Sequence, residues 1–305
     1  MEKKENSPLK ISSISDMHSM LQLPGPLHPL VSLMDNEKMS LNNDLSGKSF
    51  LLNFYKISYK YSMNGKKMGY GQGYYDFNEG GMMFTAPGQI LSPEENAEYC
   101  GYTLVIHPDF IRNYPLAKTI KSMGFFSYDT NEALHLSDQE KVIITGLLDS
   151  IKNELNTAID EVSQDVIVSY IEVLLNYSNR FYKRQFITRK AVNSDVLTKM
   201  EMILEEYFNE QKTLIHGLPT VEFLASELHL SPHYLSDMLR NLTGQNAQQH
   251  IHEKLIEKAK EYLTATTFSV SEVAYALGFE HPQSFNKLFK KKTDKTPLHY
   301  RQSFN

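Results

Sequence analysis

Hydrophobic and polar positions divide the chain into stretches with different periodicities. After a first stretch, 1–48, with no sustained period, short alternating runs separated by glycine and proline predict strands. These runs are 50–61, 69–77, 82–85, 89–91 and 99–107. The pair Asn64-Gly65 predicts a tight hairpin turn. Short strands at this spacing are typical of a small antiparallel barrel or sandwich.

Helical periodicity begins near Ser137, where Ser137-Asp-Gln-Glu140 has the pattern of a capping box. A second helix is predicted from Asp165 to Lys183, and it is apolar on two sides. One side carries Ile167, Ile171 and Leu174, and the other carries Val166, Tyr170, Val173 and Tyr177. Such a helix either packs on both sides within its own domain or contributes its second side to a dimer contact. Both interpretations stay open.

The C-terminal part contains an imperfect internal repeat, 221–244 and 270–294. Each copy has a short helix with a central alanine, then a turn, then a second helix. The small alanine lets the two helices cross closely. The turn position, His229 or Gly278, favours a positive φ, which glycine adopts freely and histidine less easily. Each copy is therefore predicted to be a helix-turn-helix pair.

A helix predicted over 247–264 separates the two copies. Its apolar stripe is Ile251, Leu255, Ile256, Ala259, Tyr262 and Leu263. At 1.5 Å per residue it spans roughly 27 Å, and successive major grooves on one face of DNA lie about 34 Å apart. A rigid strut of this length can hold both second helices on neighbouring grooves.

Two helix-turn-helix pairs joined by a helical strut resemble the arabinose-regulator (AraC/XylS) family. The residues that carry the resemblance, over about 200–303, are Leu224-Ala225, Leu228-His-Leu-Ser231, Tyr234-Leu235-Ser236, Thr243-Gly244, Lys254-Leu255, Ala259, Leu263, Val273-Ala274, Leu277-Gly-Phe279, Phe285-Asn-Lys-Leu-Phe-Lys290, Thr296-Pro297 and Tyr300-Arg301. The resemblance implies a bacterial transcription regulator with an N-terminal, ligand-sensing, cupin-like barrel and dimerisation through the helices beside it. The partners it implies are double-stranded DNA, read in the major groove, RNA polymerase, a small-molecule effector and a second copy of the chain.

We therefore predict an α+β chain, in which a small antiparallel, cupin-like β-barrel with flanking helices precedes an all-α domain. The predicted boundaries are a sensor domain at 1–136, a helical dimerisation region at 137–187, a linker at 188–196 and a double helix-turn-helix domain at 197–305.

The resemblance also places the DNA-reading faces. They are Pro232, His233, Ser236, Asp237 and Arg240 on the first reading helix, and Pro282, Gln283, Asn286, Lys287 and Lys290 on the second, with Lys291 beside them. Asparagine and glutamine can bond bidentately to adenine, and lysine can reach guanine. Arg240, Lys290 and Lys291 suit phosphates. The alternative for each position is a solvated helix face.

Two residues depart from the family pattern. Asp237 stands where a basic residue is common, and its carboxylate would either repel phosphate or accept a hydrogen bond from cytosine. Asp294 stands where glycine is frequent, which is expected to change only a turn.

Net charge does not by itself support binding to nucleic acid. The chain carries a formal charge of −5, and 201–305 holds 11 Lys+Arg against 13 Asp+Glu. Its end, 281–305, is nevertheless basic, with six cations and Asp294 as its one acid. The cations are Lys287, Lys290, Lys291, Lys292, Lys295 and Arg301. A basic end fits a phosphate footprint and equally a solvated C-terminal helix.

Other classes of protein are disfavoured. The single Cys100 cannot form an internal disulfide, no apolar run approaches the ~20 residues of a membrane span, and the N-terminus lacks the apolar core of a secretory signal. We therefore expect a cytoplasmic protein without a membrane partner. A metal-dependent cupin enzyme needs clustered ligands, whereas the histidines of the N-terminal half are scattered, and His250-Ile-His252 lies on the strut with its rings pointing apart. No catalytic residue, metal or cofactor is predicted.

Aromatic residues alternate along the predicted strands of the N-terminal half. Tyr59, Tyr61, Tyr74, Phe84 and Tyr102 are candidates for an effector pocket inside a barrel. The alternative is an ordinary core, in which case the regulator would be ligand-independent and controlled by a protein partner or by its expression level.

Overall fold

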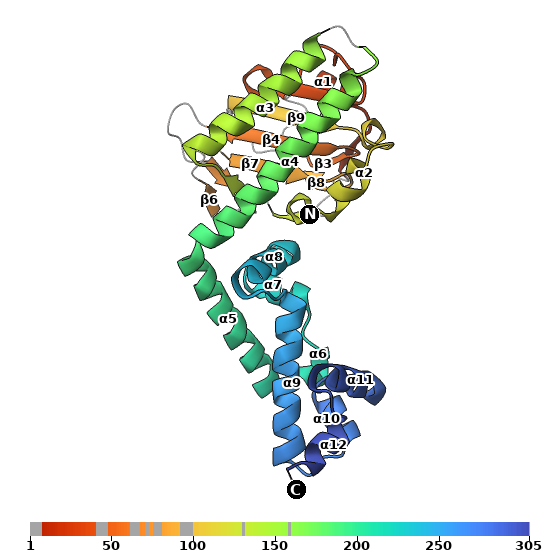
Figure 1. The fold of residues 1–305 in the computed structure, drawn as a ribbon, viewed down its shortest axis with the longest axis vertical. Coiled ribbons are helices and arrows are strands. Elements are labelled where there is room, and N and C mark those ends of the chain that lie inside the picture. Colours follow the sequence, from red (N-terminus) through yellow and green to blue (C-terminus); the bar gives the residue numbers. More distant parts are fainter. Residues whose placement is uncertain are drawn as a thin grey trace, which may run out of the picture. The chain divides into compact units, whose positions relative to one another are not determined.

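The structure is a computed structural model that describes residues 8–40, 48–61, 68–70, 73–75, 81–91, 100–129, 132–157 and 160–304, with the backbone alone at 68–70, 73–75 and 190–192. The chain divides into two compact units, Met1–Gln185 and Phe186–Asn305 (Figure 1). The predicted hairpin at Asn64-Gly65 lies outside the described residues.

The described residues of the N-terminal unit form three sheets. The largest has the strand order β10-β7-β4-β9-β2 and is antiparallel throughout, and the others are β1-β3-β8 and the hairpin β5-β6. The bounds are β1 Leu9–Ile11, β2 Val31–Asp35, β3 Phe50–Leu52, β4 Tyr55–Tyr61, β5 Met68–Tyr70, β6 Gly73–Tyr75, β7 Gly81–Thr85, β8 Ile90–Leu91, β9 Cys100–Ile106 and β10 Leu134–His135.

The small antiparallel barrel predicted from the sequence needs correction. Among the described residues the sheets do not close on one another, and β1 pairs with β3 in parallel. The single strand predicted over 50–61 is two strands in different sheets, because the chain bends at Asn53-Phe54 and buries the Phe54 ring completely. This bend contains neither glycine nor proline, and the partner of β3 comes from the first stretch, where no period was visible.

Two long helices, α3 (Asp138–Asn156) and α4 (Ser163–Thr188), cross one face of the five-stranded sheet (Figure 1). The capping box predicted at Ser137 is confirmed, since its hydroxyl accepts from the Glu140 N–H and the Glu140 carboxylate accepts from the Ser137 N–H. The other helices that the structure describes in this unit are short: α1 Ile14–Met20, η1 Asn36–Lys38, η4 Pro108–Phe110, α2 Leu116–Thr119, η5 Ile120–Ser122 and η6 Gly124–Ser127.

The opposite face of the five-stranded sheet is covered by the N-terminal segment at its β2–β9 end. There Met34 and Val105 from the sheet pack with residues of β1, α1, β3 and the bend that follows it. These partners are Ile11, Ile14, Met17, Phe50, Leu52 and Phe54.

The C-terminal unit is helical in all its regular elements, as predicted. Its helices are α5 Lys190–Asn209, α6 Thr213–His216, α7 Val221–Glu227, α8 Pro232–Thr243, α9 Ala247–Ala265, α10 Val270–Ala276, α11 Pro282–Thr293 and α12 Pro297–Gln302. The predicted polar linker, 188–196, is almost entirely helical, since α5 begins at Lys190. Asn193 is buried there and donates from Nδ2 to the carbonyl of Phe186 at 2.8 Å.

Candidate nucleic-acid interface

The two predicted helix-turn-helix pairs, α7–α8 and α10–α11, have the same turn. Its central residue has a positive φ in both copies, 55° at His229 and 90° at Gly278, as expected. In each copy the next residue donates its N–H to the alanine five residues earlier: Leu230 to Ala225 at 2.9 Å and Phe279 to Ala274 at 3.0 Å. The sequence repeat is therefore a structural repeat.

The repeat extends beyond the pair, which the sequence reasoning missed. Thr243 and Thr293 end the reading helices in the same way, each hydroxyl donating to the carbonyl four residues earlier, at 2.9 and 2.8 Å. The following residue is left-handed in both, Gly244 with φ 81° and Asp294 with φ 58°, so Asp294 fills the position of glycine at a helix end. Asn246 and Thr296 then cap α9 and α12. The matched spacing Thr-x-x-Asn and Thr-x-x-Thr was the available signal.

Each reading helix buries one side and leaves the other accessible. On α8 the side chains of Leu235, Met238 and Leu239 are fully buried, and on α11 those of Phe285 and Phe289 are. None of the predicted DNA-contact residues is buried. His233, Arg240, Gln283, Asn286, Lys287, Lys290 and Lys291 are exposed, and Pro232, Ser236, Asp237 and Pro282 are half-buried.

The cations of the two reading helices differ in their surroundings. On α8, Arg240 donates from Nη1 to Oδ1 of Asp237 at 2.6 Å, so the positive charge of this helix is offset by a carboxylate one turn away. On α11, no carboxylate of the described chain pairs with Lys287, Lys290 or Lys291. The second reading helix therefore presents the stronger positive potential.

Several cations of the C-terminal unit hold the fold together instead. Lys254 and Lys258 on α9 pair with Glu205 on α5 at 2.5 and 2.6 Å, and these hydrogen bonds lower the pKa of the Glu205 carboxyl to about 2. Arg301 donates from Nε to the carbonyl of Leu263 at 2.9 Å. Of the six cations in the basic end, Arg301 is thus engaged between α12 and α9.

The strut α9 has 19 residues, which at 1.5 Å per residue is about 28 Å. Its stripe is buried as predicted, apart from the half-buried Tyr262. The two strut histidines have separate neighbours, His250 facing the Thr243 hydroxyl at 2.9 Å and His252 facing the Gln248 amide at 3.0 Å. Burial lowers the pKa of both rings.

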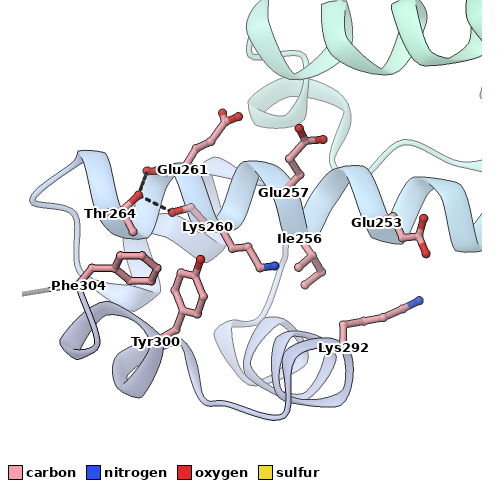
Figure 2. Close-up of a pocket in the computed structure, with 9 residues that line it drawn as sticks. All are labelled: Glu253, Ile256, Glu257, Lys260, Glu261, Thr264, Lys292, Tyr300 and Phe304. Atoms are coloured by element: carbon pink, nitrogen blue, oxygen red, sulfur yellow. Dashed lines mark hydrogen bonds between the residues drawn. The ribbon is translucent and has the colours of Figure 1, made fainter.

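A hollow of about 540 Å³ lies between α9 and the segment formed by α11 and α12 (Figure 2). It is lined by Glu253, Ile256, Glu257, Lys260, Glu261, Thr264, Lys292, Tyr300 and Phe304. The Lys260 ammonium lies 5.8 Å from the centre of the Tyr300 ring. No predicted DNA-contact residue lines this hollow, and its charges are mixed, so we assign it no part in DNA binding.

The predicted effector-pocket aromatics lie on the sheet face that α3 and α4 cover. The Tyr59 side chain faces Thr145 on α3, Phe84 lies 6.1 Å from the Tyr182 ring on α4, and the Lys152 ammonium lies 5.0 Å from the centre of the Tyr102 ring. The Tyr61 ring contacts that of Tyr59, and the Tyr74 side chain lies outside the described residues. These contacts fit the ordinary-core alternative, because the rings pack between sheet and helices.

The predicted dimer residues of α4 separate into two sides. Ile167, Ile171 and Leu174 are buried at 4% exposure or less. On the other side Val166, Tyr170 and Tyr177 are half-buried and Val173 is 40% exposed.

Two negative findings concern the part of the chain that the structure describes. No group of three or more histidine, cysteine or acidic side chains there is placed to hold a metal ion. No helix there has both the length and the apolar composition of a membrane span.

Comparison with known proteins places the similarity in the C-terminal unit. Residues 224–303 match the family model described as a helix-turn-helix domain. The chain is 32% identical over 113 residues to the bifunctional transcriptional activator/DNA repair enzyme AdaA of Bacillus subtilis, a match that covers 37% of this chain and 50% of that protein. It is 29% identical over 121 residues to the HTH-type transcriptional activator RhaS of Salmonella schwarzengrund, covering 39% and 41%.

Among solved structures, the C-terminal domain of the two-component response regulator yesN from Fusobacterium nucleatum is 32% identical, with a TM-score of 0.31. That match covers 35% of this chain and 98% of the other. The chain spans half or less of the length of the curated relatives named above.

Proposed function

We propose that this chain, whose residues 224–303 form a helix-turn-helix domain of the AraC/XylS type, is a transcription regulator that binds double-stranded DNA through α8 and α11. The observation that carries the proposal is the structural repeat. The two helix-turn-helix pairs share the same turn and the same helix ends, and each pair leaves one face of its second helix accessible. Such a face can enter the major groove while the buried side anchors it.

The two reading helices have different roles in this proposal. On α11, Gln283 and Asn286 bond to adenine edges, Lys287 reaches guanine, and Lys290 and Lys291 neutralise phosphates. On α8, the Asp237–Arg240 pair reduces the electrostatic contribution, since phosphate contacts supply most of the sequence-independent affinity. We therefore infer that α11 carries at least as much of the sequence discrimination as α8.

The strut positions the reading helices relative to each other. A helix of about 28 Å approaches the roughly 34 Å between successive major grooves on one DNA face. The pairing of Glu205 with Lys254 and Lys258 braces this strut against α5. We infer that α5 is part of the DNA-binding domain.

The N-terminal unit is proposed to regulate the DNA-binding unit and to dimerise through α4. Val166, Tyr170, Val173 and Tyr177 recur at helical spacing on the side of α4 that is only partly covered. A second copy would bury this stripe, and two DNA-binding units would then address two half-sites. A regulator of this kind acts by helping or hindering RNA polymerase at a promoter. The DNA-repair activity in the name of AdaA belongs to that protein, and we assign this chain no catalytic step.

The test is selection of binding sites from fragmented genomic DNA with the full-length protein. We expect one sequence motif to be enriched, and Asn286→Ala should change that motif. Gln302→Ala, on the exposed end of α12, is the matched control and should not change it. A fragment pool that stays unenriched at every salt concentration would overturn the assignment.

A further inference from the structure

The five-stranded sheet carries a polar stripe on the face turned away from α3 and α4. On β4, the rings of Tyr55 and Tyr59 point to the helix side, where Tyr55 lies 5.2 Å from Phe126 and Tyr59 faces Thr145 of α3. Because side chains alternate along a strand, the other face of β4 presents Lys56, Ser58 and Lys60. Thr85 of β7 and Thr103 of β9 stand beside them in the cross-strand register.

This stripe is buried, although it is polar. Ser58, Thr103, Thr85 and Lys60 are exposed by 1%, 3%, 7% and 8%. A polar sheet face normally meets water. The apolar part of the same face, at Met34 and Val105, is already filled by the N-terminal core described above. The polar part is thus a separate, protein-enclosed surface.

Most of the stripe is satisfied by internal hydrogen bonds. The Ser58 and Thr103 hydroxyls lie 3.2 Å apart, and Thr103 donates to Oδ1 of Asn36 at 2.8 Å. The Asn36 amide in turn donates to the carbonyl of Tyr59 at 3.2 Å. This network holds the strands in register and needs no ligand.

Lys56 is different, because the described part of the chain offers its ammonium no counter-charge. It is half-buried between Thr85 and Val105, and no carboxylate within the described ranges pairs with it. Burial alone lowers its pKa to about 8, so the side chain is still mostly protonated at neutral pH. Lysine is rarely buried without a partner, and a charge that is partly shielded from water and lacks one destabilises the fold.

We propose that this stripe binds a small organic anion, a carboxylate or a phosphate ester, whose charged group pairs with the Lys56 ammonium. Thr85 is the cross-strand neighbour of Lys56, and its hydroxyl would donate to the same group. The inference rests on the proposed function, because the anion would be the effector of the regulator. It also assigns the effector to the sheet face opposite the aromatic residues.

The direct test is thermal unfolding of the full-length protein at constant ionic strength, with sodium benzoate, phenyl phosphate and uncharged benzyl alcohol as probes. We expect a saturable rise in Tm of about 5 °C with one of the two anions and none with the alcohol. The anion that acts distinguishes a carboxylate site from a phosphate site. The rise should vanish in Lys56→Met and persist in Lys118→Met, a lysine exposed on α2. No rise with either anion, or an undiminished rise in Lys56→Met, would overturn the proposal.

A second measurement needs no ligand. In chloride buffer alone, Lys56→Met should have a higher Tm than the wild type, because the variant loses an uncompensated charge and keeps the aliphatic chain. A lower Tm would show that Lys56 has a structural partner and would overturn the anion site. Neither assay contains DNA, so a failure here leaves the DNA-binding assignment standing, and a failure of motif enrichment leaves the anion site standing.

Discussion

A Cβ atom on Gly278 would lie 2.7 Å from the carbonyl carbon of Gly217, closer than non-bonded carbon atoms approach. The turn of the second helix-turn-helix pair thus packs directly against the backbone that leads into the first. Position 278 requires glycine for two reasons: its φ is 90°, and the Gly217 backbone leaves no room for a Cβ atom. The equivalent His229 has only the first requirement, and its side chain is exposed.

Gly278→Ala should therefore destabilise the C-terminal unit by about 3 kcal/mol, from the strained φ and the displaced backbone together. Gly244→Ala is the control, because Gly244 has a φ of 81° and open space around it. It should cost only about 1 kcal/mol. Chemical denaturation of both variants measures the difference, and equal losses would show that the contact with Gly217 is unimportant.

Asn286→Ala and Lys290→Ala separate sequence reading from phosphate binding on α11. The first should lose about 1–3 kcal/mol of preference at one or two base pairs. The second should weaken binding to all sequences alike and lower the salt slope by about one. Fluorescence anisotropy on the enriched site and on scrambled DNA, at several salt concentrations, gives both quantities. If Asn286→Ala leaves affinity and preference unchanged, the assigned face of α11 is wrong.

Asp237→Ala tests the ion pair on α8. Because the carboxylate offsets the Arg240 guanidinium at 2.6 Å, its removal should tighten binding to all DNA several-fold and raise the salt slope by about one. The double variant Asp237→Ala/Arg240→Ala should lose this gain. If Asp237→Ala instead weakens the base preference at a single position of the DNA site, Asp237 reads a cytosine there and the ion pair is incidental.

The ion pairs of Glu205 with Lys254 and Lys258, which join α5 to α9, should weaken in acid. Hydrogen bonds from Lys254 and Lys258 lower the folded-state pKa of the Glu205 carboxyl from 4.5 to about 2, so the unfolded chain binds its proton more tightly. Its contribution to stability is complete above pH 4.5 and is lost as the pH falls toward 2. The side chain is 39% exposed, which makes this contribution modest. As the pH falls from 4.5 toward 2, the denaturant midpoint of Glu205→Gln should approach that of the wild type. The difference in midpoint between the exposed Glu206→Gln and the wild type should stay constant over the same pH range.

Val173→Asp tests dimerisation through α4. A charge in the middle of the partly covered stripe should shift the full-length protein from dimer to monomer in sedimentation at micromolar concentration. Val142→Asp, on α3, adds the same charge at a site that is 73% exposed and should leave the dimer intact. A wild-type monomer would mean that the stripe only packs within its own unit.

The sequence by itself determined the two helix-turn-helix pairs of the C-terminal unit and the turn residue of each, but it missed the matching helix ends at Thr243 and Thr293 and the start of α5 at Lys190. Many helix ends there follow local chemistry: serine and threonine hydroxyls accept from the first turn of α7, α8, α10 and α12, and a residue with positive φ follows α7, α8, α10 and α11. Apolar stripes at helical spacing then identify the buried sides of α8, α9 and α11. These signals act within a few residues, so one sequence suffices to detect them.

Only the tertiary structure decided which surfaces are free. Alternation puts Tyr59 and Lys56 on opposite faces of β4, but α3 and α4, distant in sequence, determine that the tyrosine meets helices and the lysine does not. Likewise Arg301 belongs to a basic segment in the sequence, and its contact with Leu263 engages it within the fold. Periodicity reports the side of an element on which a residue lies, whereas the partner on that side comes from long-range packing, which no local pattern contains.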